Sequence, residues 1–111
     1  MNVVLLLALL ITLPVAAVSQ VRVFLAGDST CADKLPEKRP ETGWGEMFGK
    51  HFKGGKVKIE NRAMNGRSTK TFISEGRWQK ILDDMQKGDW VFVQFGHNDS
   101  SKEKGERYAP P

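Results

Sequence analysis

The sequence is poor in the residues that bind metals and form disulfides. Among its 111 residues it has one cysteine, Cys31, and two histidines, His51 and His97. A single cysteine excludes an internal disulfide, so the fold must be stabilised by its core alone. The sequence contains no C-x-x-C or H-E-x-x-H pattern and no cluster of cysteine and histidine. It therefore predicts no metal site.

The sequence also lacks an apolar run long enough to span a membrane. Its longest one, VVLLLALLITL at residues 3–13, falls short of the roughly 20 residues that a bilayer requires. Pro14 and the small residues 16–19 follow this run, which predicts a signal peptide over residues 1–19 and a secreted or periplasmic protein with no stable membrane partner after cleavage. No Lys or Arg precedes the run, and a short membrane anchor or a buried N-terminal helix are the alternatives.

The excess of positive charge is small and scattered. The chain carries 17 Lys and Arg against 13 Asp and Glu, a formal net charge of +4. The densest cluster, Lys53, Lys56 and Lys58, is interrupted by glycine, and neither basic repeats nor a nucleic-acid motif accompanies it. We expect a solvated face and no nucleic-acid partner, whereas a polyanionic substrate remains compatible with the charge.

Hydrophobic patterning predicts alternating strands and helices. Short apolar, β-branched runs predict strands at residues 21–26, 57–59 and 90–95. Helical patterns lie between them at residues 44–52 and 72–86. The order β-α-β-α-β implies right-handed crossovers, hence an α/β fold with a parallel sheet and helices on its faces.

The third predicted strand, WVFVQF at residues 90–95, is nearly continuous in apolar residues. Such a run is typical of a strand that is covered on both faces. We therefore expect Trp90 and, from its place on the apolar stripe of the second helix, Trp78 to pack in the core. Residues 100–111 (SSKEKGERYAPP) have no periodicity and predict a loop.

A distinctive polar cluster follows each predicted strand. Residues 27–30 read GDST, residues 61–69 read NRAMNGRST, and residues 96–99 read GHND. In an open parallel sheet, ligands bind outside the carboxyl ends of the strands. We expect the three clusters to meet at one edge of the sheet.

These clusters hold the parts of a nucleophilic site. A hydroxyl at a strand-to-helix turn, such as that of Ser29, is a candidate nucleophile whose own N–H can face a developing oxyanion. Gly66 offers a second backbone N–H and the Asn98 carboxamide offers a third donor, which together predict an oxyanion hole. Each residue taken alone has a structural alternative: Ser29 as a helix N-cap, Gly66 as a turn residue, and Asn98 or Asp99 as an Asx-turn former.

The three clusters resemble blocks I, II and III of the SGNH (GDSL-type) hydrolases. The longer stretches FLAGDST, ETGWGEMF, NRAMNGRSTKTFISEGRW and GDWVFVQFGHND are similar to the rhamnogalacturonan acetylesterase branch of that family. The resemblance implies a three-layer, flavodoxin-like parallel sheet with flanking helices, present here as its first β-α-β-α-β portion. On this interpretation residues 20–111 are the N-terminal portion of an SGNH hydrolase domain.

The same resemblance assigns roles and a reaction. Ser29 is the implied nucleophile, the oxyanion hole consists of Ser29, Gly66 and Asn98, and Asp28 and Asp99 are supporting residues. The implied chemistry is hydrolysis of acetyl esters on a pectic polysaccharide or oligosaccharide through a serine acyl-enzyme, without metal or cofactor.

One element of the family pattern is missing. The family takes its general base and orienting acid from a D-x-x-H motif, and no such motif occurs in these 111 residues. His51 lies near the end of a predicted helix, and His97 occupies the variable position of the third block, so neither replaces that base. The triad Asp and His are therefore absent, and we expect little esterase activity from this chain. The alternatives are a non-catalytic carbohydrate-binding or interaction remnant of the same fold, or an unstable fragment.

Three further residues have candidate roles. Arg67 is a candidate partner for a uronate carboxylate, with a solvated or backbone-bonding role as the alternative. Trp44, between two glycines, is a candidate sugar-stacking residue. Cys31 is expected to be a small buried hydrophobe.

Overall fold

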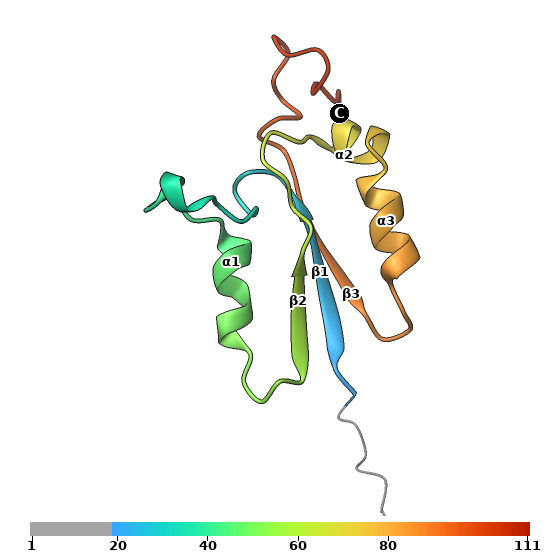
Figure 1. Ribbon diagram of the computed structural model, residues 1–111. Helices are drawn as coiled ribbons and strands as arrows, with labels where there is room; N and C mark the ends of the chain where they lie inside the picture. Colours follow the sequence, from blue (N-terminus) through green and yellow to red (C-terminus); the bar gives the residue numbers. More distant parts are fainter. Residues whose placement is uncertain (1–18) are drawn as a thin grey trace, which may run out of the picture.

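A computed structural model describes residues 19–111 of the chain. The expected signal peptide lies outside these residues apart from Ser19. The described part contains three parallel strands, β1 (Val21–Gly27), β2 (Val57–Asn61) and β3 (Trp90–Gln94). Their order in the sheet is β2-β1-β3 (Figure 1). The predicted strands and their parallel arrangement are confirmed.

Strand β1 is central because its side chains are apolar on both faces. Val23 and Leu25 pack on one face with the buried residues Cys31, Ala32 and Ala63. Phe24 and Ala26 pack on the other face with Phe72 and Ile81. Alternation along a strand sends successive side chains to opposite faces, so this single strand supplies both halves of the core.

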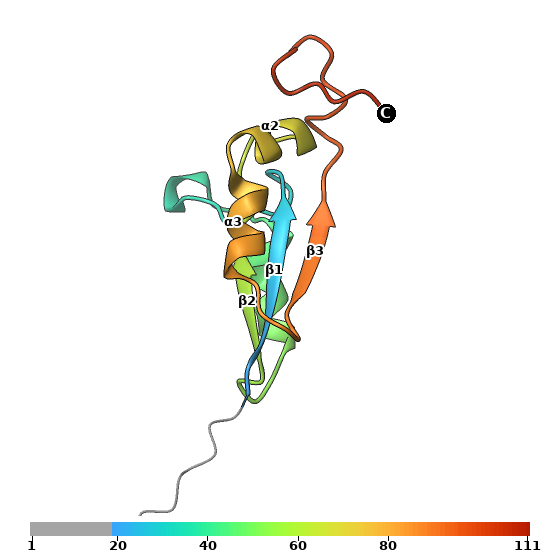
Figure 2. The same cartoon turned by 90° about the vertical axis from the view of Figure 1, so that its right-hand side faces the viewer.

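Helices cover both faces of the sheet, which confirms the three-layer α/β architecture (Figures 1 and 2). Helix α1 (Trp44–Phe48) continues into a 3-10 turn, η2 (Gly49–His51), and packs Phe48 against the Val23 face. The expected helix over residues 44–52 is thus confirmed, with a tighter final turn. A second 3-10 turn, η1 (Pro36–Lys38), precedes α1.

The expected single helix over residues 72–86 is wrong. The structure has two helices here, α2 (Thr69–Ser74) and α3 (Arg77–Asp84). Gly76 separates them with φ +72°, a left-handed conformation that interrupts the helix and that glycine adopts at little cost. The apolar stripe bridges this break: Phe72 of α2 and Ile81 of α3 are both buried against Phe24.

The expectation of a fully covered third strand is also wrong for the described residues. Val91 packs on the Phe24 face, but Trp90 is 63% exposed, and Phe92 and Val93 are exposed as well. Strand β3 is an edge strand of the described sheet, and only Phe92 reaches the α1 layer, 5.6 Å from the ring of Phe48. Trp90 is therefore no core residue here, whereas Trp78 does pack against the core.

The chain after β3 forms turns without further helix or strand, as expected for residues 100–111. It lies at the carboxyl end of the sheet, close to α2 (Figures 1 and 2). Among residues 19–111, no helix has the length and apolar composition needed to cross a bilayer.

Candidate active site

The loop after β1 places Ser29 at the carboxyl end of the central strand. Asp28 is fully buried, and its Oδ1 accepts hydrogen bonds from the amide of Thr30 at 3.0 Å and from its hydroxyl at 2.8 Å. The Asp28 carbonyl accepts from the amides of Cys31 and Ala32. This turn leaves Ser29 half-buried at its tip. Asp28 thus supports the turn through its contacts with Thr30.

The loop after β2 lies against the end of β1. The amide of Met64 donates to the carbonyl of Gly27 at 3.0 Å, which ties the two strand ends together. Two residues further on, Gly66 has φ +75°, a conformation in which a Cβ costs about 1–2 kcal/mol. Glycine at this position allows the tight turn formed by residues 65–67.

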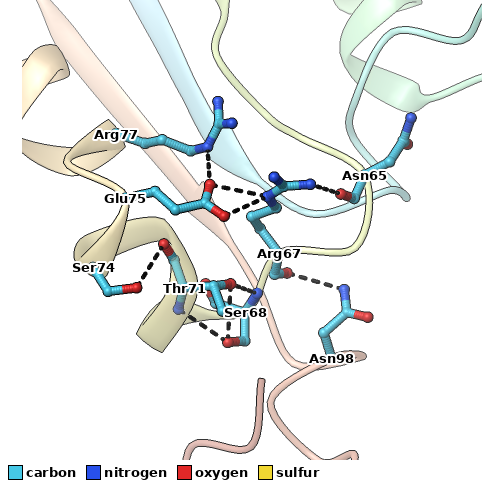
Figure 3. A network of polar contacts seen from close by, with 8 residues as sticks. All are labelled: Asn65, Arg67, Ser68, Thr71, Ser74, Glu75, Arg77 and Asn98. Carbon is cyan, nitrogen blue, oxygen red and sulfur yellow. Dashed lines mark hydrogen bonds and ion pairs between the residues drawn. The ribbon is translucent and has the colours of Figure 1, made fainter. Parts of the chain in front are cut away.

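The loop after β3 meets the same turn from the other side. The Asn98 side chain is buried, and its Nδ2 donates to the carbonyl oxygen of Arg67 at 2.9 Å (Figure 3). The neighbouring Asp99 accepts from the amide and hydroxyl of Thr69, the first residue of α2. Asp99 therefore has a supporting role, because it fixes the start of α2 beside Asn98.

A buried lysine connects the Ser29 loop to the same turn. The Nζ of Lys34 donates to the backbone carbonyl of Ser29 and, at 2.9 Å, to the side-chain oxygen of Asn65. The residues on either side of Gly66 are thus tied to the other two clusters, Asn65 to Ser29 through Lys34 and Arg67 to Asn98. The loops that carry Ser29 and Asn98 thus both attach to the Gly66 turn, and the roles of these three residues stay a prediction.

The hydrogen-bond donors of this site are largely unused. Within residues 19–111, the amides of Ser29 and Gly66 donate no hydrogen bond, and the Ser29 hydroxyl has no partner. One hydrogen of the Asn98 amide is bound by Arg67, which leaves the second available. A hydroxyl with adjacent unused N–H donors is suited to attack on a carbonyl and to stabilisation of the oxyanion that results.

A cation that the sequence did not single out lies beside this site. The Arg107 guanidinium is 3.4 Å from the Oδ1 of Asn98, and its Nη2 is 3.3 Å from the position of a Cβ added to Gly66. A hollow is lined here by Gly66, Arg67, Thr71, Glu75, Glu106 and Arg107. No local pattern marks Arg107, because it lies in a loop without periodicity.

Arg67 is held within the protein. Its Nε donates to both oxygens of Glu75, at 3.2 and 3.0 Å, and its Nη1 donates to the Asn65 carbonyl (Figure 3). Hydrogen bonds from Arg67 and then from Arg77 lower the pKa of Glu75. These contacts favour the backbone-bonding role of Arg67 over binding of a uronate.

Trp44 lies beside the Ser29 loop. Its amide donates to the Thr30 carbonyl at 3.0 Å, and its indole Nε1 lies 3.3 Å from the Oε1 of Gln94. The side chain is 36% exposed. Trp44 therefore keeps an accessible ring beside Gln94, at the end of β3, compatible with a sugar-stacking role.

Neither histidine contacts the site. His51 is exposed at the end of η2, and His97 is exposed in the loop before Asn98. Within the described residues, no imidazole bonds to the Ser29 hydroxyl and no group of three His, Cys, Asp or Glu is placed to hold a metal. Cys31 is fully buried as expected, and burial raises the pKa of its thiol to about 11, so it is no nucleophile.

The chain is similar to several esterases. It is 48% identical over 89 residues to a probable rhamnogalacturonan acetylesterase, YesY of Bacillus subtilis, covering 80% of this chain and 40% of that protein. It is 44% identical over 89 residues to the rhamnogalacturonan acetylesterase RhgT of the same organism, covering 80% of this chain and 38% of RhgT. A rhamnogalacturonan acetylesterase of Emericella nidulans is 43% identical over 77 residues, 69% of this chain and 28% of that protein.

The fold has a counterpart among solved structures. The crystal structure of YxiM from Bacillus subtilis matches with a TM-score of 0.70 and 26% identity, covering 79% of this chain and 25% of that one. No protein-family model matches the chain. The chain spans about two fifths of the length of YesY and RhgT. Over the part of their length that it spans, the chain is a homologue of the rhamnogalacturonan acetylesterases and has the α/β fold of the SGNH hydrolases.

Proposed function

We propose that this chain carries the nucleophile and oxyanion-binding part of a secreted carbohydrate acetylesterase that acts on acetylated rhamnogalacturonan. The observation that carries the proposal is the double attachment of the Gly66 turn, to Ser29 through Lys34 and to Asn98 through the Arg67 carbonyl. This arrangement supports the proposal of an oxyanion hole because it ties the loops that carry the three candidate donors to one turn. The substrate class is inferred from the relatives.

In the proposed reaction, the Ser29 oxygen attacks the acetyl carbonyl carbon and loses its proton to a base. The carbonyl oxygen becomes an oxyanion that accepts from the amides of Ser29 and Gly66 and from the Asn98 Nδ2. Collapse of this intermediate breaks the bond to the sugar oxygen, which takes up a proton, and leaves an acetyl-Ser29 ester. Water then attacks that ester and releases acetate.

The base for the first step is the part that the described residues do not provide. Both histidines are exposed, neither imidazole is hydrogen-bonded to Ser29 within residues 19–111, and the sequence has no D-x-x-H. Because histidine assistance supplies a large share of the rate in serine hydrolases, we expect slow turnover from these residues alone. The second candidate is a protein that binds acetylated oligosaccharide without hydrolysing it.

Acetate release from acetylated rhamnogalacturonan and from an aryl acetate distinguishes the two candidates. The esterase proposal expects a low rate that disappears in Ser29→Ala and persists in Ser101→Ala, a matched change in the loop after β3. Binding of the oligosaccharide with no Ser29-dependent release would support the second candidate. Release that is equal in Ser29→Ala and in the unmodified protein would show that Ser29 is not the nucleophile.

A further inference from the structure

The buried ammonium of Lys34 is a charged group at the site for which the proposed reaction has no use. Its side chain is only 4% exposed. A lysine is rarely buried unless its charge is paired and its donors are satisfied, because desolvation of an ammonium is costly. The desolvation cost at this position must be offset by specific hydrogen-bond and ion-pair partners.

All three donors of Lys34 have an acceptor. The Nζ bonds to the carbonyl of Ser29 and to the Asn65 Oδ1, and it lies 3.3 Å from the Oε1 of Glu41. Three N–H donors facing three oxygens is the arrangement of a charged ammonium. A group held in this state donates only, so Lys34 does not serve as the missing base.

Two partners of Lys34, the Ser29 carbonyl and the Asn65 side chain, belong to different loops. Ser29 follows β1, and Asn65 precedes Gly66 in the loop after β2, so these partners are far apart in the sequence. The two backbone donors of the candidate oxyanion hole come from these same loops, at Ser29 and Gly66. Oxyanion stabilisation depends on donors that are already in place before the charge develops.

The loop that carries Lys34 is itself anchored. The amide of Lys34 donates to the Oε1 of Glu46 at 2.6 Å, and the Oε2 of Glu46 accepts from Arg39 at 2.7 Å. The hydrogen bond from Arg39 lowers the pKa of Glu46, so this carboxylate stays charged at neutral pH. The backbone of Lys34 is therefore held in place, which fixes the point from which its side chain extends.

We propose that Lys34 is a positioning residue that holds the Ser29 loop and the Gly66 turn at a fixed separation, so that their two amides bind one oxyanion. The inference rests on the proposed function, since it assigns a role within the same oxyanion hole. Lys34 acts through the backbone of Ser29 and the side chain of Asn65 and does not contact the reacting atoms.

Phenylboronic acid is a suitable probe because its adduct imitates the tetrahedral intermediate without requiring turnover. The Ser29 oxygen donates a lone pair to the trigonal boron, an O–B bond forms, and the hydroxyl proton passes to the solvent. No bond to boron breaks, and the boron becomes a tetrahedral anion whose oxygens take the place of the oxyanion. The dissociation constant of this adduct, measured by NMR, reports on the oxyanion hole.

We expect Lys34→Met to weaken the adduct by about tenfold or more, because small displacements of such groups are costly. The matched control Lys38→Met, at an exposed lysine of η1, should leave the dissociation constant unchanged. Unfolding by urea is measured for the same variants. If Lys34 were merely structural, Lys34→Met would lower the free energy of unfolding but leave adduct formation by the folded protein intact. An equal dissociation constant in folded Lys34→Met and in the unmodified protein would overturn the proposal.

Asn65→Ala keeps the test decisive if Lys34→Met does not fold. It removes one acceptor of Lys34 at an exposed turn and leaves the ammonium bonded to Ser29 and Glu41. We expect a severalfold weaker adduct, and no change would overturn the role of Lys34.

Ser29→Ala distinguishes failure of the proposed function from failure of the role of Lys34. An adduct signal that persists in Ser29→Ala, or the absence of any signal in the unmodified protein, contradicts the proposed function and with it the role of Lys34. An adduct that is lost in Ser29→Ala and unaffected by Lys34→Met contradicts the role of Lys34 alone.

Discussion

The Nδ2 of Asn98 donates a hydrogen bond of 2.9 Å to the carbonyl oxygen of Arg67, and the Arg107 guanidinium lies 3.4 Å from the Oδ1 of the same amide. These two contacts fix the orientation of the carboxamide, because exchanging its oxygen and nitrogen would set two donors or two acceptors against each other. The second hydrogen of Nδ2 therefore has a defined direction. This fixed amide is the basis of the first prediction.

Asn98→Ala should weaken the phenylboronic acid adduct by about a hundredfold or more. Removal of one oxyanion-hole donor costs about 3 kcal/mol in comparable sites. Because the Asn98 amide is buried and oriented, its deletion should remove the whole of this stabilisation. The measurement is the dissociation constant of the adduct, together with the rate of aryl acetate hydrolysis. Ser100→Ala, an exposed change in the same loop, is the control. Unchanged binding in Asn98→Ala would remove Asn98 from the oxyanion hole.

Gly66→Ala should both destabilise the protein and damage the site. The left-handed conformation at φ +75° costs a Cβ about 1–2 kcal/mol, and the added carbon would lie 3.3 Å from the Nη2 of Arg107. Gly76→Ala is a matched control, because Gly76 has φ +72° and nothing within 4 Å of an added Cβ. Urea unfolding should show a similar loss for both, whereas only Gly66→Ala should weaken the adduct. Equal adduct binding in both variants would mean that the Gly66 amide binds no oxyanion.

Ser68→Ala should lower the free energy of unfolding by about 1 kcal/mol, the usual effect of losing an N-cap. Ser68 is fully buried at the start of α2, where its Oγ accepts from the Thr71 amide, and the Thr71 hydroxyl accepts from the Ser68 amide at 2.8 Å. Urea denaturation measures the change. Ser74→Ala, at the exposed end of α2, should have an effect within about 0.5 kcal/mol. An equal effect of the two changes would contradict the capping role.

Helix α2 begins at Thr69, before the predicted helix over residues 72–86, because its start depends on a polar cap and not on the apolar run. The Ser68 hydroxyl acts on the Thr71 amide, three residues away. The break at Gly76 was missed because the spacing of Phe72, Ile81 and their neighbours fits one helix as well as two. Packing against Phe24 preserves the stripe across the break, so hydrophobic periodicity does not reveal it.

The candidate site was predictable to the extent that its residues follow strands. The positions of Ser29, Gly66 and Asn98 after successive parallel strands were enough to place their three loops at one end of the sheet. Lys34 and Arg107 were missed because their roles depend on contacts between loops that no short motif encodes. The exposure of Trp90 was missed for a related reason. An apolar run indicates that a strand is suited to burial, but it does not indicate which strands or helices cover it.

Acid should destabilise the protein below about pH 5.5. The pKa values of Glu46, Glu75, Asp84 and Asp89 are all lowered in the folded state. For Asp89 the main causes are a hydrogen bond from the Gln86 amide and then bonds from Arg22. A carboxyl with a lowered pKa contributes its full stability above its unfolded value, about 3.9 for Asp and 4.3 for Glu, and loses it as the pH falls towards the folded value.

Urea unfolding between pH 7 and pH 3 tests this expectation. The free energy of unfolding should be steady from pH 7 to about pH 5.5 and should fall below that range. Asp89→Asn should be less stable than the unmodified protein at pH 7 and should lose less on acidification, since it has one fewer group to protonate. A protein that keeps its neutral-pH stability at pH 3 would show that these ion pairs contribute nothing to folding.

Cys31 should resist thiol reagents in the native protein and react on unfolding. Its side chain is fully buried on the α1 side of the sheet, and burial raises the pKa of the thiol to about 11, so at pH 8 only on the order of one thiol in a thousand is the reactive thiolate. Labelling by Ellman's reagent at pH 8 should therefore be slow in buffer, and in urea its rate should rise in step with the unfolded fraction. Because Val23 and Leu25 pack beside Cys31, labelling measures the opening of the layer that supports the Ser29 loop. Fast labelling without denaturant would show that this layer opens often, and the oxyanion hole would then lack the rigid support that its function requires.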